Sequence, residues 1–368
     1  QGEYNLYQYT PTVVKEADGK WYLTSIKIDN VVNGGGDTGG DTGGGTGGGT
    51  GGDTGGGTGG DTGGGTGGVV TTVTGPVRTI GQSGLALHNL WLKETNNLDK
   101  RLGDLRAGQT ESAGVWARYN RGKVERGQSS LKYNLFQAGI DKDSQGENET
   151  TYRGVAVSHA KGDGSYEIGS GDLSETTLSL YQTGVRKGGQ YYDVILKAGR
   201  YVDEYNLVSS GGNSARGDYH TWGYSVSGEY GVRKQLGKGG YVEPQAELIL
   251  GRIQGVDYTT STNLKARMDA QNKAVARLGL AFGQEFKGGS LYGKASFYHD
   301  FGGGLQVRAA DGSNSIGYTE TLARNWGELS LGGTAKVGKN MMLYGELSKY
   351  IGQLSSNLQV NLGARWSF

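Results

Sequence analysis

The feature that most constrains this chain is a regular alternation of apolar and polar residues through residues 113–368. Near the C-terminus, Leu358 and Val360 alternate with Gln359 and Asn361. Successive side chains of a strand point to opposite faces, so this period of two predicts strands. The twelve predicted strands lie near 113–121, 130–142, 150–161, 174–186, 190–204, 218–234, 241–253, 272–286, 290–302, 324–337, 340–351 and 357–368.

Strand length and connection length separate two folds that share this alternation. A soluble antiparallel sandwich also alternates, but soluble strands average about 5–6 residues and most of these are longer. Tight connections such as "RKGGQ" and "FKGG" are interspersed with long polar ones such as "NLVSSGGNSARGD". Periplasmic turns, extracellular loops and a charged inner face are typical of outer-membrane barrels. The pattern therefore predicts an all-β fold, a 12-stranded antiparallel outer-membrane β-barrel.

Composition agrees with a membrane barrel and excludes several other functions. The chain has 23 tyrosines and 6 tryptophans, and such barrels carry aromatic girdles at both interfaces. A net charge of +1 gives no reason to expect nucleic acid as a partner. The chain has no cysteine, and its four histidines lack the spacing of metal ligands. We therefore expect a monomer in contact with outer-membrane lipid, with no cofactor and no bound metal.

Three regions precede the barrel, which we assign to residues 113–368. Residues 1–32 contain two aromatic-rich alternating stretches around "KEADGK", which predict a β-hairpin. Residues 33–82 are a glycine-, threonine- and aspartate-rich linker with its lead-in. Residues 83–112 are predicted to hold a helix.

The predicted helix has the length of a membrane crossing. Ser83 is a plausible N-cap. The 21 residues from Leu85 to Leu105 would span about 32 Å at 1.5 Å per residue, close to the hydrocarbon thickness of about 30 Å. One stripe of the helix is apolar, formed by Leu87, Trp91, Leu98, Leu102 and Leu105. These features favour an α-helix inside the pore, although a surface helix on a soluble domain would give the same local pattern.

Four motifs resemble the C-terminal translocator domain of the type V autotransporters. They are "NNLDKRLGDLR", "AGVWARYNRG", "YVEPQAELILGR" and the terminal "ARWSF". The resemblance covers roughly residues 85–368. It implies a twelve-stranded barrel that brings an N-terminal passenger through the outer membrane with help from the barrel-assembly machinery. Trp366 and Phe368 look like its outer-membrane assembly signal.

The same resemblance places the chain in a larger protein. Residues 1–32 look like the last rung and cap of a β-helical passenger. The chain begins at Gln1, without a methionine, and we expect it to be part of a longer precursor. The expected location is the outer membrane of a Gram-negative-type (diderm) bacterium, with the passenger at the cell surface. The biological effect would belong to the passenger, so we expect no enzyme activity on external substrates.

The pair Asn96-Asn97 raises the question of self-cleavage. An asparagine side-chain amide can attack its own backbone carbonyl, forming a succinimide and breaking the next peptide bond. The reaction needs a near-attack geometry and groups that handle protons. The segment resembles the linker of secreted serine-protease autotransporters, which cut themselves between two such asparagines inside the barrel.

That resemblance also implies a set of lumen residues that support the cut. By local motif they fall on Asp193, Glu229, Glu247, Glu346 and Arg365. In the predicted strand register, all five side chains face the lumen.

Two other functions stay open at this point. Many autotransporters keep their helix intact, so the protein could be an uncleaved surface-display anchor, with the lumen carboxylates simply lining a polar pore. A small-solute porin would need an open lumen, which a helix of this length would largely fill in a twelve-stranded barrel.

Overall fold

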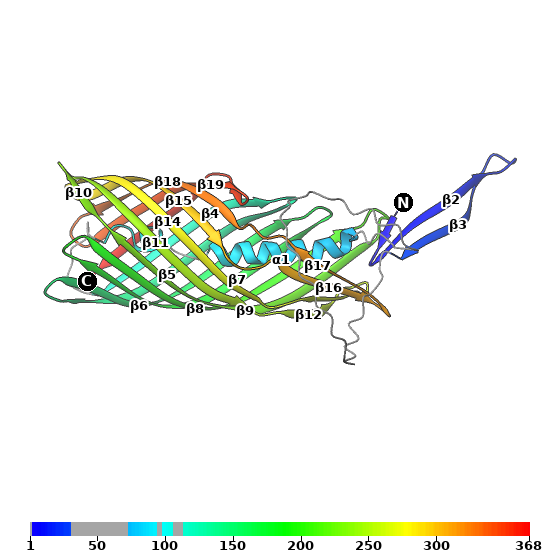
Figure 1. The fold of residues 1–368 in the computed structure, drawn as a ribbon, viewed down its shortest axis with the longest axis horizontal. Coiled ribbons are helices and arrows are strands. Elements are labelled where there is room, and N and C mark those ends of the chain that lie inside the picture. The colour runs from blue at the N-terminus through cyan, green and yellow to red at the C-terminus, as the bar shows by residue number, and fades with distance from the viewer. Residues whose placement is uncertain (1, 31–72, 94–97, 106–112) are drawn as a thin grey trace, which may run out of the picture.

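A computed structural model describes residues 2–30, 73–93, 98–105 and 113–368. In these ranges, twelve antiparallel strands close into a barrel, which confirms the predicted fold class (Figure 1). Ser367 of the last strand pairs with Gly114 of the first, and the ring is complete. The barrel strands are β4 Gly114–Arg126, β5 Ser129–Gln145, β6 Glu149–Ser165, β7 Gly169–Arg186, β8 Gln190–Val208, β9 Ser214–Val232, β11 Gly240–Ile253, β14 Gln271–Phe286, β15 Gly289–Asp300, β18 Asn325–Val337, β19 Met341–Gly352 and β21 Gln359–Ser367.

The two faces of the wall follow the alternation. Outward side chains are apolar and exposed, such as Leu178 (55%), Leu278 (65%) and Leu331 (69%). Inward side chains are mostly polar and buried, such as Asp193 and Lys197. An apolar outer band and a polar interior are the arrangement that lipid on one side and a lumen on the other require.

The connections differ between the two ends of the barrel. At one end they are short, as at Lys187–Gly189 and Lys287–Gly288, where Gly189 and Gly288 have φ of 91° and 88°. We call this the short-turn end; it also holds the C-terminus (Figure 1). The opposite, long-loop end carries the N-terminal hairpin. Strands β4 to β9 are longer than predicted, so three expected loops at the long-loop end, including "NLVSSGGNSARGD", shrink to residues 127–128, 166–168 and 209–213.

Residues 254–271 and 303–323, which lie between predicted strands, are in fact partly strands. β12 (Val256–Thr259), β13 (Lys265–Met268), β16 (Leu305–Asp311) and β17 (Asn314–Glu320) form a separate four-stranded sheet at the long-loop end. Its central pairing joins Lys265 to Ala310. Its apolar residues are buried with those of the pore helix. This burial explains why segments with little local strand signal pair there.

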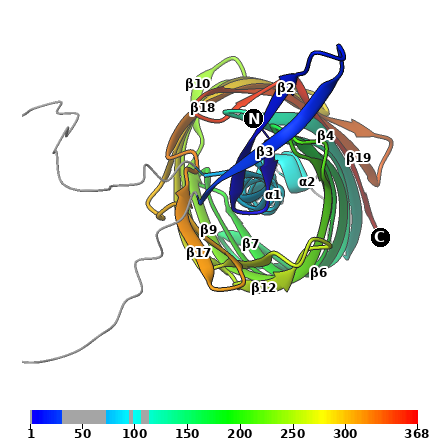
Figure 2. The same cartoon turned by 90° about the vertical axis from the view of Figure 1, so that its right-hand side faces the viewer.

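The pore holds two helical segments, α1 (Gly75–Lys93) and α2 (Leu98–Leu102). Viewed along the barrel, α1 lies inside the ring of strands (Figure 2). Ser83 is not the N-cap: α1 begins eight residues earlier, and the Ser83 hydroxyl donates to the Ile80 carbonyl within the helix. Pro76 occupies the first turn, where its missing N–H has no cost. In the described ranges, no helix is long and apolar enough to cross a bilayer on its own.

The predicted hairpin is present in residues 2–30. β2 (Tyr7–Lys15) pairs with β3 (Trp21–Asn30), and β1 (Gly2–Tyr4) adds a third strand. Two short strands extend the barrel sheet: β10 (Lys234–Gly237) pairs with β11, and β20 (Ser355–Ser356) pairs with β4.

Candidate functional site in the barrel lumen

The candidate site surrounds α2, in the half of the lumen nearer the short-turn end. Asn96 and Asn97 lie outside the described residues. Leu98, the residue after Asn97, begins α2 and is buried. The surroundings of Leu98 therefore define what the barrel offers next to the candidate cleavage bond.

Four charged residues on consecutive strands form a continuous row at this level, which we call the acid row. Asp193 of β8 pairs with Glu229 of β9, which pairs with Glu247 of β11, which pairs with Arg277 of β14. All four side chains are buried inside the barrel. The Arg277 guanidinium lies 3.0 Å from Glu229 and 2.8 Å from Glu247. One arginine therefore serves two of the candidate carboxylates.

Glu229 contacts Leu98, the first described residue after the candidate bond. The Leu98 backbone N–H donates to Glu229 Oε2 at 2.9 Å, and the Tyr191 hydroxyl donates to Oε1 at 2.6 Å. A carboxylate on an N–H at the start of a helical turn satisfies one of its free donors. Glu229 thus holds the backbone one residue beyond Asn97.

Asp193 fixes the other side of α2. Arg101 donates to Asp193 Oδ1 at 2.5 Å, and the Thr183 hydroxyl donates to the same oxygen. The Arg101 guanidinium also lies 4.2 Å from the centre of the Tyr181 ring. These contacts set the rotation of α2 relative to the acid row.

Glu346 lies in a second group, contributed by other strands. Lys100 forms ion pairs with Glu328 and, at 3.4 Å, with Glu346. Lys294 lies 3.2 Å from both Glu346 and Asp99 of α2. The structure therefore connects Glu346 to the same helix through lysines, but places it apart from the acid row.

Arg365 belongs to a third group. It makes two hydrogen bonds to Asp141, one of them 2.8 Å long. Asp141 also accepts a 2.6 Å bond from the Tyr181 hydroxyl. Because Tyr181 stacks on Arg101, Arg365 is connected to α2 through two intermediate residues.

A small cavity lies beside these groups. Its volume is about 20 Å³, and Lys93 of α1, Lys100 of α2 and Glu247 of the acid row are among its lining residues. That is room for one water molecule. The cavity therefore lies between Lys93, the last residue of α1, and Lys100 of α2 with its partners on the wall.

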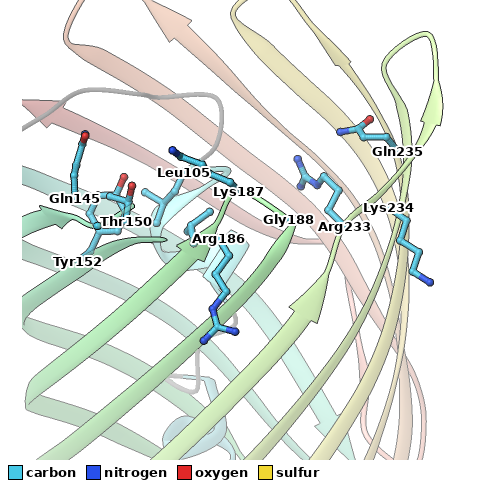
Figure 3. A pocket seen from close by; sticks show the side chains of 13 residues that line it. Leu105, Gln145, Thr150, Tyr152, Arg186, Lys187, Gly188, Arg233, Lys234 and Gln235 are labelled. Carbon is cyan, nitrogen blue, oxygen red and sulfur yellow. The ribbon is translucent and has the colours of Figure 1, made fainter. Parts of the chain in front are cut away.

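A larger opening lies between α2 and the short-turn end of the barrel. Its volume is about 950 Å³, and Leu105, Tyr152, Arg186 and Arg233 are among its lining residues (Figure 3). Arg233 lies 2.6 Å from Asp104, and it also pairs with two wall glutamates. The chain is thus anchored to the wall by charge as far as Asp104, two residues after α2 ends.

Sequence reasoning missed several members of these groups. Arg277, Glu328, Lys294 and Asp141 are absent from the predicted set, yet each pairs with a predicted residue or with α2. The same period of two that placed the other five residues could have found them, because they occupy inward positions of their strands.

Together, a closed twelve-stranded barrel with an apolar outer band and a helix through its lumen defines a plugged outer-membrane β-barrel. The family model described as the autotransporter beta-domain matches residues 114–348. The chain therefore belongs to the autotransporter β-domain family, and it is a translocator barrel of the outer membrane of Gram-negative bacteria. This confirms the resemblance and the location predicted from the sequence.

Known relatives support this assignment. The BrkA autotransporter of Bordetella pertussis is 30% identical over 294 residues, which cover 77% of this chain and 29% of that protein. Serine protease EspP of Escherichia coli is 28% identical over 292 residues, covering 76% and 22%. The chain thus spans less than a third of these relatives.

Solved structures show the same fold. The β domain of Bordetella BrkA has a TM-score of 0.58 and 26% identity, covering 70% of this chain and 99% of that one. The translocator domain of NalP from Neisseria meningitidis has a TM-score of 0.62 and 14% identity, covering 79% and 99%.

Proposed function

We propose that this barrel carries an N-terminal passenger to the cell surface and that the passenger ends in residues 1–32. The supporting observation is the path of the chain. α1 starts beside the N-terminal hairpin at the long-loop end, and α2 lies among wall residues nearer the short-turn end. In this proposal, residues 33–82 are the linker and lead-in, although the pore helix already begins within that range, at Gly75. Residues 83–112 complete the crossing.

Two partners belong to this proposal. The outward side chains of β4 to β21 would contact outer-membrane lipid. The barrel-assembly machinery would recognise the terminal strand, where Trp366 and Phe368 are 51% and 56% exposed.

An epitope in the turn 16–20 tests the export step. Antibody should label intact cells that make the protein. Labelling only after the outer membrane has been permeabilised would overturn the proposal.

The second part of the proposal is self-cleavage between Asn96 and Asn97. The Asn96 side-chain nitrogen bonds to the Asn96 carbonyl carbon, and the bond from that carbon to the Asn97 nitrogen breaks. One proton leaves the attacking amide and one arrives on the departing Asn97 amine. The products are a C-terminal succinimide and a free Asn97 amine, so no further reactant is consumed.

The lumen offers a role for each predicted residue. Glu229 would hold the chain after the bond through the Leu98 N–H. Glu247, which lines the cavity with room for one water, would pass the proton from amide to amine. Asp193 and Glu346 would fix α2 through Arg101 and Lys100. Arg365 would act as a positioning residue, through Asp141 and Tyr181.

Intact mass of the membrane-folded chain tests cleavage. The wild type should yield a barrel fragment that begins at Asn97, and Asn96→Ala should stay whole. Glu247→Gln should slow the cut by about 100-fold, the lower range for losing a positioned acid–base group. Glu175→Gln, a buried carboxylate of β7, is the matched control and should cut normally.

Full-length chain in every sample would overturn cleavage. The protein would then be an uncleaved anchor, and the antibody experiment alone would test the export proposal.

A further inference from the structure

The N-terminal strand pair makes a turn that is buried against the barrel. Tyr4 of β1 pairs with Tyr7 of β2, which leaves Asn5 and Leu6 as a two-residue turn. Asn5 has φ of 50°, a left-handed conformation that asparagine tolerates better than most residues. Asn5 and Leu6 are only 3% and 1% exposed. A turn at the end of a hairpin is normally in solvent, so this burial indicates a docking contact.

The Asn5 amide is bound at both ends by the loops of the long-loop end. Its Nδ2 donates to the Thr262 carbonyl at 3.1 Å and to Asp311 Oδ2 at 2.8 Å. Its Oδ1 accepts from the Thr262 hydroxyl at 2.7 Å. A buried amide with both its donor and acceptor groups bonded requires one orientation and one register. The contact is therefore specific for this turn.

Glu3 connects the turn to the start of the pore helix. Its carboxylate accepts from the Gly75 N–H at 2.8 Å, and its carbonyl accepts from the Ser209 hydroxyl at 2.7 Å. The Thr74 hydroxyl donates to the Asn5 carbonyl at 2.5 Å. An acidic side chain at a helix N-terminus binds a free N–H and is favoured by the helix dipole. The same turn thus contacts barrel loops and α1 together.

The rest of the hairpin lacks this burial. Val13, Trp21 and Leu23 are 52%, 66% and 58% exposed. Among the hairpin residues whose side chains the structure describes, docking is therefore confined to residues 2–9, and the outer part of β2 and β3 projects away from the barrel (Figure 1).

The residues that flank the connecting segment 31–72 are both held at this docking contact. Asn30 pairs with Tyr7 of the docked strand, and Thr74 bonds to Asn5. Since almost no distance has to be bridged, the docked turn, rather than the length of the connection, sets the position of the hairpin.

We propose that residues 2–9 are a latch, which binds the long-loop end of the barrel and holds the N-terminal hairpin there independently of the covalent connection through 31–72. The site is an interaction surface for this peptide, formed by Ser209, Thr262, Asp311 and the first residues of α1. If the proposed passenger assignment is right, the latch keeps the end of the passenger on the barrel; the docking itself does not require that assignment.

Distance measurement between two spin labels tests the latch in the full chain. The protein has no cysteine, so labels at Val13→Cys and Asp218→Cys would be the only ones. A single narrow distance distribution is expected in the parent. Asn5→Gly keeps the left-handed backbone but removes the amide, and Leu6→Asp places a charge in a buried position; both should broaden the distribution. Thr12→Asp, in the projecting part of β2, should leave it narrow.

A second measurement separates docking from tethering. A site-specific protease sequence placed in 31–72 is cut, with scission verified after denaturation, and the N-terminal fragment left on the barrel is counted. The parent should keep the fragment, and Asn5→Gly should release it at least about tenfold faster, as expected for losing several buried hydrogen bonds.

A broad distribution in the parent, or release of the parent fragment as fast as that of Asn5→Gly, would overturn the latch. Heat-modified gel mobility confirms that each barrel is folded. Failure of the latch would leave the antibody and mass experiments unaffected, because neither depends on residues 2–9 being docked.

Discussion

The two helical segments in the pore differ in the balance of contacts that hold them. In α1, 18 of 19 residues are buried, and its core is apolar. Trp91 packs so closely that a Cβ added to Gly251 of the wall would lie 2.5 Å from its ring. In α2, by contrast, Asp99, Lys100 and Arg101 each form an ion pair with the wall.

This difference indicates two tasks for one chain. Apolar packing fills space and excludes water, and it tolerates exchange of one apolar side chain for another of similar volume. Buried ion pairs demand matched partners at fixed positions, because an unpaired buried charge is costly. α1 is therefore suited to sealing the pore, and α2 to holding the neighbouring chain in a defined place beside the acid row.

Removing both segments should give the largest effect. Deleting residues 75–102 removes the apolar helix α1 and the ion-paired helix α2 together, and single-channel conductance should rise sharply. Deleting the N-terminal residues 2–30 alone is the control and should raise conductance far less. Equal conductance with and without 75–102 would show that the wall closes the pore unaided.

Trp91→Ala should give the next largest effect. Loss of a fully buried tryptophan costs about 3–5 kcal/mol in the free energy of unfolding. The measurement is the unfolding midpoint of the detergent-folded protein in urea. Trp222→Ala is the matched control, since Trp222 is 43% exposed on the outer face. A similar loss in both variants would mean that α1 is not the packed element.

Lys100→Met should give the third-largest effect, a loss of about 3 kcal/mol in the free energy of unfolding, because Glu328 and Glu346 lose a shared partner. The loss is limited because Lys294 still pairs with Glu346. Lys100→Met with Glu328→Gln should recover part of the loss, since one uncompensated charge is also removed. A double-mutant cycle measures this coupling. Strict additivity would argue that the pair contributes nothing specific to α2.

Ionic strength should give the smallest effect. Raising salt from 0.1 to 1 M shortens the Debye length from about 10 to 3 Å. Amide exchange in residues 98–102 should quicken by no more than about twofold, because these pairs are buried, and residues 85–92 should not change. A large response in α1 would contradict its description as apolar packing.

Much of the barrel could be predicted because its signal is local. The period of two predicts the strands. The same alternation predicts that the side chains of Asp193 and Glu229 both point into the lumen. The strand count is predictable for a similar reason, since each connection at the short-turn end carries its own glycine signal, as at Gly189 and Gly288.

The remaining features depend on contacts between distant residues. The sequence favours a helix start at Ser83 because "TGPVRTIGQSG" contains a proline and three glycines. Burial in the pore and the Glu3 carboxylate at Gly75 outweigh that weak propensity. The sheet that joins Lys265 to Ala310 unites segments 45 residues apart, so no local window contains it. The grouping of Glu346 with Lys100, apart from the acid row, likewise needs the barrel register.

The pairing of β21 with β4 has a topological consequence. The barrel is a ring closed by hydrogen bonds, and α1 and α2, which precede β4 in the chain, lie inside it as a linear thread. Because β21 pairs with β4, the thread can leave the ring only by sliding lengthwise through the lumen. A docked hairpin at the outer rim then acts as a stopper against movement inward. After a cut at Asn96, the outer piece could leave in one direction only, without the ring having to reopen.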